Sequence, residues 1–195
     1  MSDSSGKGNL LGAVEKSPFF TFAKPYLDFI GKGTMFTIVY ILMAVASLLM
    51  PFAIIFWAAN NGIFNMGAQG VTWFILTWIF TAFAGWIGFQ LWWERKSQVV
   101  EVKESEFVAT PIIADIVRTF GEWIGTLMAI IGFAAGLFGV IILGQYMNYV
   151  LPGGPMLIAA GPVAGFFTIL LFRLLAEALR VFVNIANSLR DIAKK

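Results

Sequence analysis

The chain divides into four long apolar segments joined by shorter polar connections. The apolar segments cover residues 35–59, 71–93, 111–144 and 156–192. Each contains the roughly 20 predominantly apolar residues that a helix needs to cross a bilayer. Helices satisfy their backbone polar groups internally, as lipid requires of a spanning segment. We therefore expect an all-α polytopic membrane protein, in which residues 35–195 form a domain of four transmembrane helices.

The segment before the first apolar run, residues 1–34, is rich in aromatic side chains toward its end. They surround Lys24 and Asp28 and are Phe19, Phe20, Phe22, Tyr26 and Phe29. Aromatic rings favour the headgroup region of a bilayer, so we expect a cytoplasmic N-terminal tail followed by an interfacial segment. Because Pro25 interrupts the pattern, a tail that only lies next to the membrane is the alternative.

Basic residues are confined to three regions of the chain. They are Lys7, Lys16, Lys24, Lys32, Arg95, Lys96, Lys103, Arg118, Arg173, Arg180, Arg190, Lys194 and Lys195. Residues 60–70 and 145–155 carry no charge. The positive-inside rule therefore predicts that both termini and the middle connection face the cytoplasm. Thr110 and Pro111 resemble an N-cap and a first helical position, so the third helix, like the fourth, is expected to extend into the cytoplasm.

The composition excludes several classes of chemistry. The 195 residues include no cysteine and no histidine. Disulfides, thiolate nucleophiles, histidine bases and the usual ligands of zinc, haem and iron–sulfur clusters are therefore missing. We expect no catalytic residue, cofactor or metal site, and no enzymatic activity. The net charge is +2, but no basic cluster with interleaved aromatic residues indicates nucleic-acid binding.

Charged residues recur at helical spacing on the third and fourth segments. They are Asp115, Arg118 and Glu122 on the third, and Arg173, Glu177 and Arg180 on the fourth. Spacings of three and four place each set on one helix face. On antiparallel neighbours the two sets would form a ladder of opposite charges: Asp115 with Arg180, Arg118 with Glu177, and Glu122 with Arg173. A register set by the turn at 152–155 would bring Glu122 to Arg180 instead.

These charges have two interpretations. As a structural ladder they would pair at the cytoplasmic boundary, where arginine side chains can reach the headgroups. As an ion path, Glu122, Arg173 and Glu177 would line a pore, since ionisable residues within a membrane are often functional. The ladder is favoured because the outer halves of the helices contain few polar side chains.

Glycines recur at the spacing of close helix contacts. The pairs are Gly121 with Gly125, Gly132 with Gly136, and Gly161 with Gly165. A GxxxG spacing lets two helix backbones approach each other in lipid. We interpret the pairs as packing within the chain, with dimerisation as the alternative.

The polar face of the last segment continues toward the C-terminus. It carries Asn184, Asn187 and Asp191, and Arg190 completes the set of possible docking residues. Because polar residues increase in this direction, we expect the helix to leave the bilayer here and to offer a surface on which a partner docks.

The stretch LLFRLLAEALRVFVNIANSLRDI, residues 170–192, resembles the C-terminal signature of a family of uncharacterised bacterial multi-pass membrane proteins of unknown function. The matching positions are Arg173, Glu177, Asn187 and Arg190. The resemblance implies a location in the bacterial cytoplasmic (inner) membrane and brings no activity with it.

These expectations lead to a hypothesis of an integral membrane structural or accessory subunit that docks partners through its charged cytoplasmic helix ends. Its partners would be membrane lipids and other membrane subunits, or further copies of itself. The alternative is a small oligomeric channel or transporter component with Glu122, Arg173 and Glu177 along its path. A membrane enzyme that uses Asp115 and Glu122 as acid and base ranks third.

Overall fold

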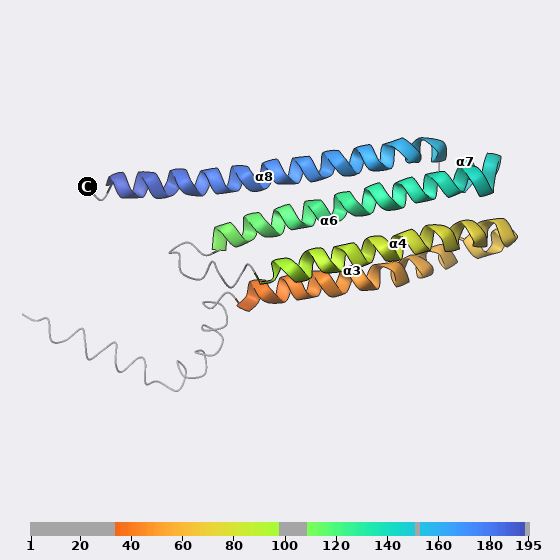
Figure 1. Cartoon of the computed structure of the whole chain (residues 1–195), viewed down its shortest axis with the longest axis horizontal. Helices are drawn as coiled ribbons and strands as arrows, with labels where there is room; N and C mark the ends of the chain where they lie inside the picture. The colour runs from red at the N-terminus through yellow and green to blue at the C-terminus, as the bar shows by residue number, and fades with distance from the viewer. Residues whose placement is uncertain (1–33, 98–108, 151–152, 194–195) are drawn as a thin grey trace, which may run out of the picture.

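The computed structural model describes residues 34–97, 109–150 and 153–193 (Figure 1). Within these residues the long helices are α3 (Thr34–Asn60), α4 (Gly67–Arg95), α6 (Ala109–Phe138) and α8 (Leu157–Ala193). All four are long and apolar enough to span a membrane. This confirms the all-α class and supports a multi-pass membrane protein. The expected N-terminal interfacial segment lies outside the described residues.

The four long helices lie in a row, in the order α3, α4, α6 and α8 (Figure 1). Consecutive helices are antiparallel, so α3 begins and α8 ends at the same end of the row. The most extensive contact is the one between α6 and α8. Because α8 packs mainly on α6, one of its faces is open.

The connection between α6 and α8 is folded into short helical turns. A π-helical turn (Gly139–Leu143) follows α6, and a 3₁₀ turn (Gly144–Tyr146) and α7 (Met147–Val150) come next. The regular α-helix therefore ends before residue 144, where we expected the third helix to end. The change of helix type coincides with the fully buried side chain of Met147, whose Cε would lie 2.6 Å from a Cβ on Gly139.

Two tryptophans of α4 bond to the backbones of the helices on either side. The indole N–H of Trp73 donates to the carbonyl of Ala135 on α6 over 3.1 Å. The indole N–H of Trp78 donates to the carbonyl of Pro51 on α3 over 2.8 Å. Lipid offers no hydrogen-bond acceptor to a buried indole N–H. These two bonds therefore satisfy the indole N–H groups of Trp73 and Trp78, and they also hold α4 between α3 and α6.

Direct backbone contact joins α6 to α8. A Cβ atom on Gly132 would lie 2.8 Å from the Cα of Gly161, and one on Gly125 would lie 2.5 Å from the carbonyl oxygen of Gly165. Real Cβ atoms essentially never come closer than 3.0 Å to a heavy atom outside their own residue and its neighbours in the chain. Only glycine therefore allows the two helices to lie this close.

The other glycines of the GxxxG pairs lie in the same contact. A Cβ on Gly136 would lie 2.7 Å from the backbone nitrogen of Ile158, and one on Gly121 would overlap the side chain of Phe172. All six glycines thus face the partner helix within the chain.

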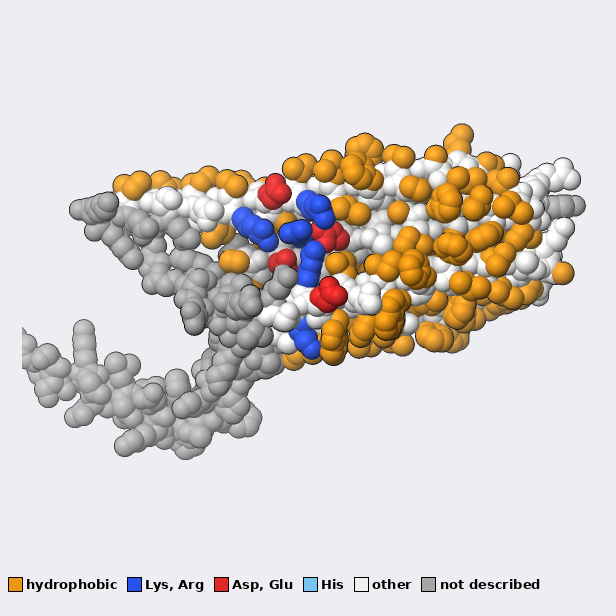
Figure 2. All heavy atoms as spheres, viewed as in Figure 1, with side chains coloured by type: hydrophobic (Ala, Val, Ile, Leu, Met, Phe, Trp, Pro, Cys, Tyr) orange, Lys and Arg blue, Asp and Glu red, His pale blue; other side chains and the backbone are white. Residues whose placement is uncertain are grey.

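Apolar side chains cover most of the visible face of the molecule, whereas charged side chains gather toward one end of it (Figure 2). Large apolar side chains such as Phe56, Ile141 and Phe166 are strongly exposed, as is normal where lipid is the solvent. The end of the row where α3 begins and the charged side chains gather is called the charged end below.

The glycine contact leads to a stability prediction. Replacing Gly132 with leucine places a side chain against the backbone of Gly161, so the variant should lose about 1–3 kcal/mol of unfolding free energy, the usual cost of overpacking. Unfolding of the detergent-solubilised protein measures this loss. The matched control is Ala159→Leu, which adds the same side chain at an exposed position of α8. Equal stability of the two variants would contradict the prediction.

Candidate functional site

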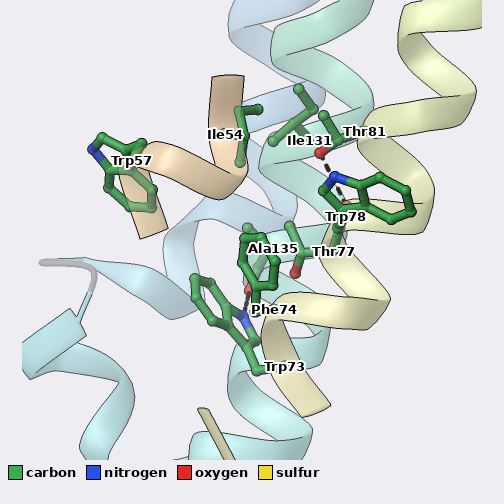
Figure 3. A pocket seen from close by; sticks show the side chains of 9 residues that line it. All are labelled: Ile54, Trp57, Trp73, Phe74, Thr77, Trp78, Thr81, Ile131 and Ala135. Atoms are coloured by element: carbon green, nitrogen blue, oxygen red, sulfur yellow. Dashed lines mark hydrogen bonds between the residues drawn. The ribbon is translucent and has the colours of Figure 1, made fainter. Parts of the chain in front are cut away.

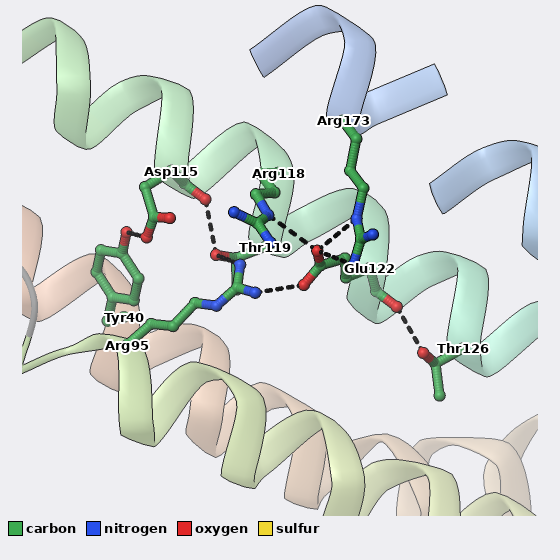
Figure 4. Close-up of polar contacts among 8 residues, drawn as sticks. All are labelled: Tyr40, Arg95, Asp115, Arg118, Thr119, Glu122, Thr126 and Arg173. Atoms are coloured by element: carbon green, nitrogen blue, oxygen red, sulfur yellow. Dashed lines mark hydrogen bonds and ion pairs between the residues drawn. The ribbon is translucent and has the colours of Figure 1, made fainter. Parts of the chain in front are cut away.

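The charged end is organised around Glu122, a residue of α6 that is only 7% exposed. Three arginines reach its carboxylate (Figure 4). Arg118 Nε donates to Oε1 over 3.0 Å, and Arg173 Nε donates to the same oxygen over 2.9 Å. Arg95 Nη2 donates to Oε2. Because the arginines belong to α6, α8 and α4 respectively, this one carboxylate bonds to three helices.

The local sequence explains why Glu122 acquires these partners. Arg118 precedes it by four residues, a spacing that puts both side chains on one helix face. The adjacent Gly121 lets Phe172 of α8 lie directly on α6. The residue after Phe172 is Arg173, which is thereby brought within reach of the carboxylate.

A second chain of hydrogen bonds runs from α3 through α6 to α4. The hydroxyl of Tyr40 donates to the carboxylate of Asp115 over 2.7 Å. The hydroxyl of Thr119 donates to the carbonyl of Asp115 over 2.7 Å and accepts from Arg95 Nη1 over 2.7 Å. The ring of Tyr40 is fully buried, edge-on to Trp92. All four long helices are thus tied together at the charged end.

Glu122 and Arg173 form the pair expected of the simple ladder. The alternative register, with Glu122 against Arg180, is not adopted by the described residues. The glycine contact accounts for this choice, since Gly132 lies level with Gly161 and sets α6 against α8.

The other two ladder pairs were wrong. Among the described residues no ion pair joins Asp115 to Arg180, or Arg118 to Glu177. Arg118 finds Glu122 on its own helix, and Asp115 accepts the hydroxyl of Tyr40 instead.

Glu177 and Arg180 line a cleft together with Arg118, Arg173 and Ala176. These charged side chains therefore gather around an opening between α6 and α8 and do not form the outer rungs of a closed ladder.

Sequence reasoning missed the roles of Arg95 and Tyr40. Arg95 was counted only among the basic residues that orient the chain, and Tyr40 only as part of an apolar run. The sequence did offer one signal for them. Arg95 and Tyr40 are polar side chains, a guanidinium and a phenol, on segments that also reach the charged end. Nothing in the sequence shows that these segments lie beside α6.

The four residues expected to dock a partner all belong to the last turns of α8. Asn184 is exposed. The side chains of Asn187, Arg190 and Asp191 lie outside what the structure describes.

An apolar cavity of about 220 Å³ lies among α3, α4 and α6 (Figure 3). Its lining is Ile54, Trp57, Trp73, Phe74, Thr77, Trp78, Thr81, Ile131 and Ala135. The hydroxyl of Thr81 donates to the carbonyl of Thr77 over 3.0 Å. The buried hydroxyl of Thr77 has no hydrogen-bond partner among the described residues. The lining contains no charged side chain.

The described residues also contain no cluster of three or more acidic side chains that could hold a metal ion. Asp115 and Glu122, the proposed acid and base, are both engaged in the bonds above. The carboxylate of Asp115 therefore bonds a side chain of α3, and that of Glu122 bonds side chains of α4, α6 and α8.

Comparisons with protein-family models, curated proteins and solved structures find no match to this chain. The resemblance of residues 170–192 to a bacterial membrane protein family stays a prediction.

Neutralising Glu122 should destabilise the fold strongly. In Glu122→Gln three guanidinium groups face a neutral amide, and breaking a buried ion pair in this way costs about 3–5 kcal/mol of unfolding free energy. The matched control is Glu177→Gln, which removes an exposed carboxylate on α8 and should cost less than about 1 kcal/mol. Equilibrium unfolding in one detergent compares the two variants. Similar small losses in both would show that Glu122 does not hold the helices.

The arginines around Glu122 should contribute unequally. The side chain of Arg95 is 15% exposed and that of Arg173 is 51% exposed. Arg95→Gln should therefore cost about 1.5–3 kcal/mol, as for a shielded charged hydrogen bond. Arg173→Gln should cost less than about 1 kcal/mol, because water and headgroups screen it. The same unfolding measurement ranks the two, and a larger loss in Arg173→Gln would contradict the assignment.

Proposed function

We propose that this protein is a structural or accessory subunit of a membrane complex and that α8 is its assembly surface. The observation that carries the proposal is the open face of α8, which packs mainly on α6 through its opposite side. Ala176 on the packed side is 2% exposed, whereas Phe182 is 70% exposed and Ile192 is 69% exposed.

The open face carries a regular apolar stripe. Its residues alternate at spacings of four and three and are Leu171, Leu175, Ala178, Phe182, Ile185, Leu189 and Ile192. All of them are exposed. A 4–3 repeat of apolar side chains is the pattern by which one helix packs along another.

The stripe continues beyond the length that a bilayer covers. α8 has 37 residues and is therefore about 55 Å long, against a hydrocarbon core of about 30 Å. It projects past the start of α6 at the charged end (Figure 1). Lipid would cover only part of the stripe, and large apolar side chains left in water favour association. A helix of another membrane subunit, or of a second copy, would cover all of it.

The proposal includes an orientation. We place the charged end, and with it both termini, on the cytoplasmic side of a bacterial inner membrane. The absence of charge from residues 60–70 and 145–155, the connections at the opposite end, supports this side, and the resemblance of residues 170–192 supports this membrane. The projecting end of α8 would then meet its partner at the cytoplasmic surface.

A channel has less support. A path for ions needs polar groups through the whole membrane, whereas the cavity among α3, α4 and α6 is lined almost entirely by apolar side chains. Glu122, the residue proposed to line the path, has both carboxylate oxygens bonded to arginine.

Photo-crosslinking in native membranes tests the assembly surface. The chain has no cysteine, so single cysteines carrying a benzophenone can be introduced at Leu171, Phe182 and Leu189. Ile79 and Phe83 serve as controls, since they are exposed apolar positions on α4. We expect protein adducts of constant mass from the α8 positions and none from the controls. An adduct of twice the chain mass identifies a second copy as the partner, and any other constant mass identifies a different subunit.

Equal adduct yields from α8 and α4, or none from either, would contradict the proposal. Leu174 and Val181 provide a second comparison, because they are exposed positions of α8 that lie outside the 4–3 series. Lower yields there than at the stripe positions are expected if a helix lies along the stripe.

A further inference from the structure

The cleft between α6 and α8 at the charged end has a volume of about 120 Å³. Its charged lining consists of Arg118 from α6 and of Arg173, Glu177 and Arg180 from α8. One water molecule occupies about 30 Å³ of liquid, so the cleft has room for a larger polar group. Its lining contains three guanidinium groups and one carboxylate, which favours an anion.

The guanidinium groups retain donors that can face such an anion. Each arginine has five N–H donors. Arg118 bonds Glu122 through Nε, and Arg173 does so through Nε and Nη2. No hydrogen bond or ion pair joins the guanidinium of Arg180 to another of the described residues. Planar guanidinium donors that converge on one opening match the oxygens of a phosphate group.

Glu122 does not cancel this positive charge. Its carboxylate is already surrounded by three arginines, including Arg95 from outside the cleft. At the charged end the four arginines therefore exceed the three carboxylates of Glu122, Glu177 and Asp115 by one charge. Glu177 is the residue that would oppose an anion within the cleft itself.

The position of the cleft indicates the source of the anion. The charged side chains lie beside the apolar surface that the membrane would cover (Figure 2). Arg118 and Arg173 approach each other from the two helices beside Glu122 (Figure 4). A basic pocket between transmembrane helices at this level is suited to the headgroup of an anionic lipid.

We propose that this cleft binds a phosphate group, carried by an anionic phospholipid of the surrounding membrane. The bound headgroup would accept from Arg118, Arg173 and Arg180. This binding is separate from the assembly role of α8, because the cleft faces α6 and the apolar stripe faces away from it.

Lipid retention by the full chain tests the proposal. The protein is reconstituted in nanodiscs containing equal amounts of phosphatidylglycerol and phosphatidylcholine, released into detergent, and the lipids that stay bound are measured by native mass spectrometry. We expect phosphatidylglycerol to be retained preferentially. Arg180→Gln should weaken its retention about fivefold, the effect of removing one cation near an anionic headgroup.

Two further variants separate binding from a general charge effect. Glu177→Gln should strengthen retention of phosphatidylglycerol, because it removes the carboxylate that repels the phosphate. Lys96→Gln should leave retention unchanged, because Lys96 lies over the ring of Trp93 on α4 and does not line the cleft. Equal retention in all four proteins, or equal loss in Arg180→Gln and Lys96→Gln, would overturn the proposal.

Inorganic phosphate distinguishes the two sources of the anion. Titration of the detergent-solubilised protein with sodium phosphate, against sodium chloride of the same ionic strength, measures binding of the free ion. Tight phosphate binding without any preference for phosphatidylglycerol would show that the cleft takes a soluble anion and would overturn the lipid assignment. A preference for phosphatidylglycerol that only high concentrations of phosphate reduce supports it.

Discussion

One buried carboxylate joins α4, α6 and α8 of this protein. Glu122 lies within a segment long and apolar enough to span a membrane and is almost inaccessible. An unpaired carboxylate in such surroundings costs several kcal/mol. The fold meets this cost by bringing Arg95, Arg118 and Arg173 to the two oxygens of the carboxylate. Because two of these arginines come from α4 and α8, both helices must flank α6 at one relative height.

Close packing between the helices stabilises their association in addition to the ion pairs at the charged end. Lipid chains are as apolar as the helix surfaces, so helices in a membrane associate through contact and hydrogen bonds. Between α6 and α8 the contact is backbone on backbone at Gly132 and Gly161. The contact between α4 and its neighbours depends on the indole hydrogen bonds of Trp73 and Trp78. The row therefore has ionic bonds at the charged end and close contacts along its length, and it leaves the outer face of α8 open.

The sequence predicted the helices well and their partners only in part. Four long apolar segments imply four helices, because lipid leaves the backbone little alternative. The helical spacing of the charged residues also predicted that Glu122 pairs with Arg173, because α6 and α8 are consecutive and antiparallel. It did not reveal Arg95 as a partner of Glu122. An apolar pattern shows which segments enter the membrane and not which of them lie side by side. Tyr40 and Asp115 are separated by 75 residues in the sequence, so their pairing is equally undetermined by it.

If Glu122 couples α4 to α8, substitutions at Arg95 and Arg173 must influence each other through its carboxylate. A triple-mutant cycle measures this directly, by comparing the unfolding free energies of Arg95→Gln, Arg173→Gln and their combination with Glu122 present and with Glu122→Gln. The expected result is a coupling energy of about 0.5–3 kcal/mol with Glu122 present and strict additivity once it is glutamine. Additive losses in both backgrounds, or the same coupling in both, would contradict the role assigned to Glu122.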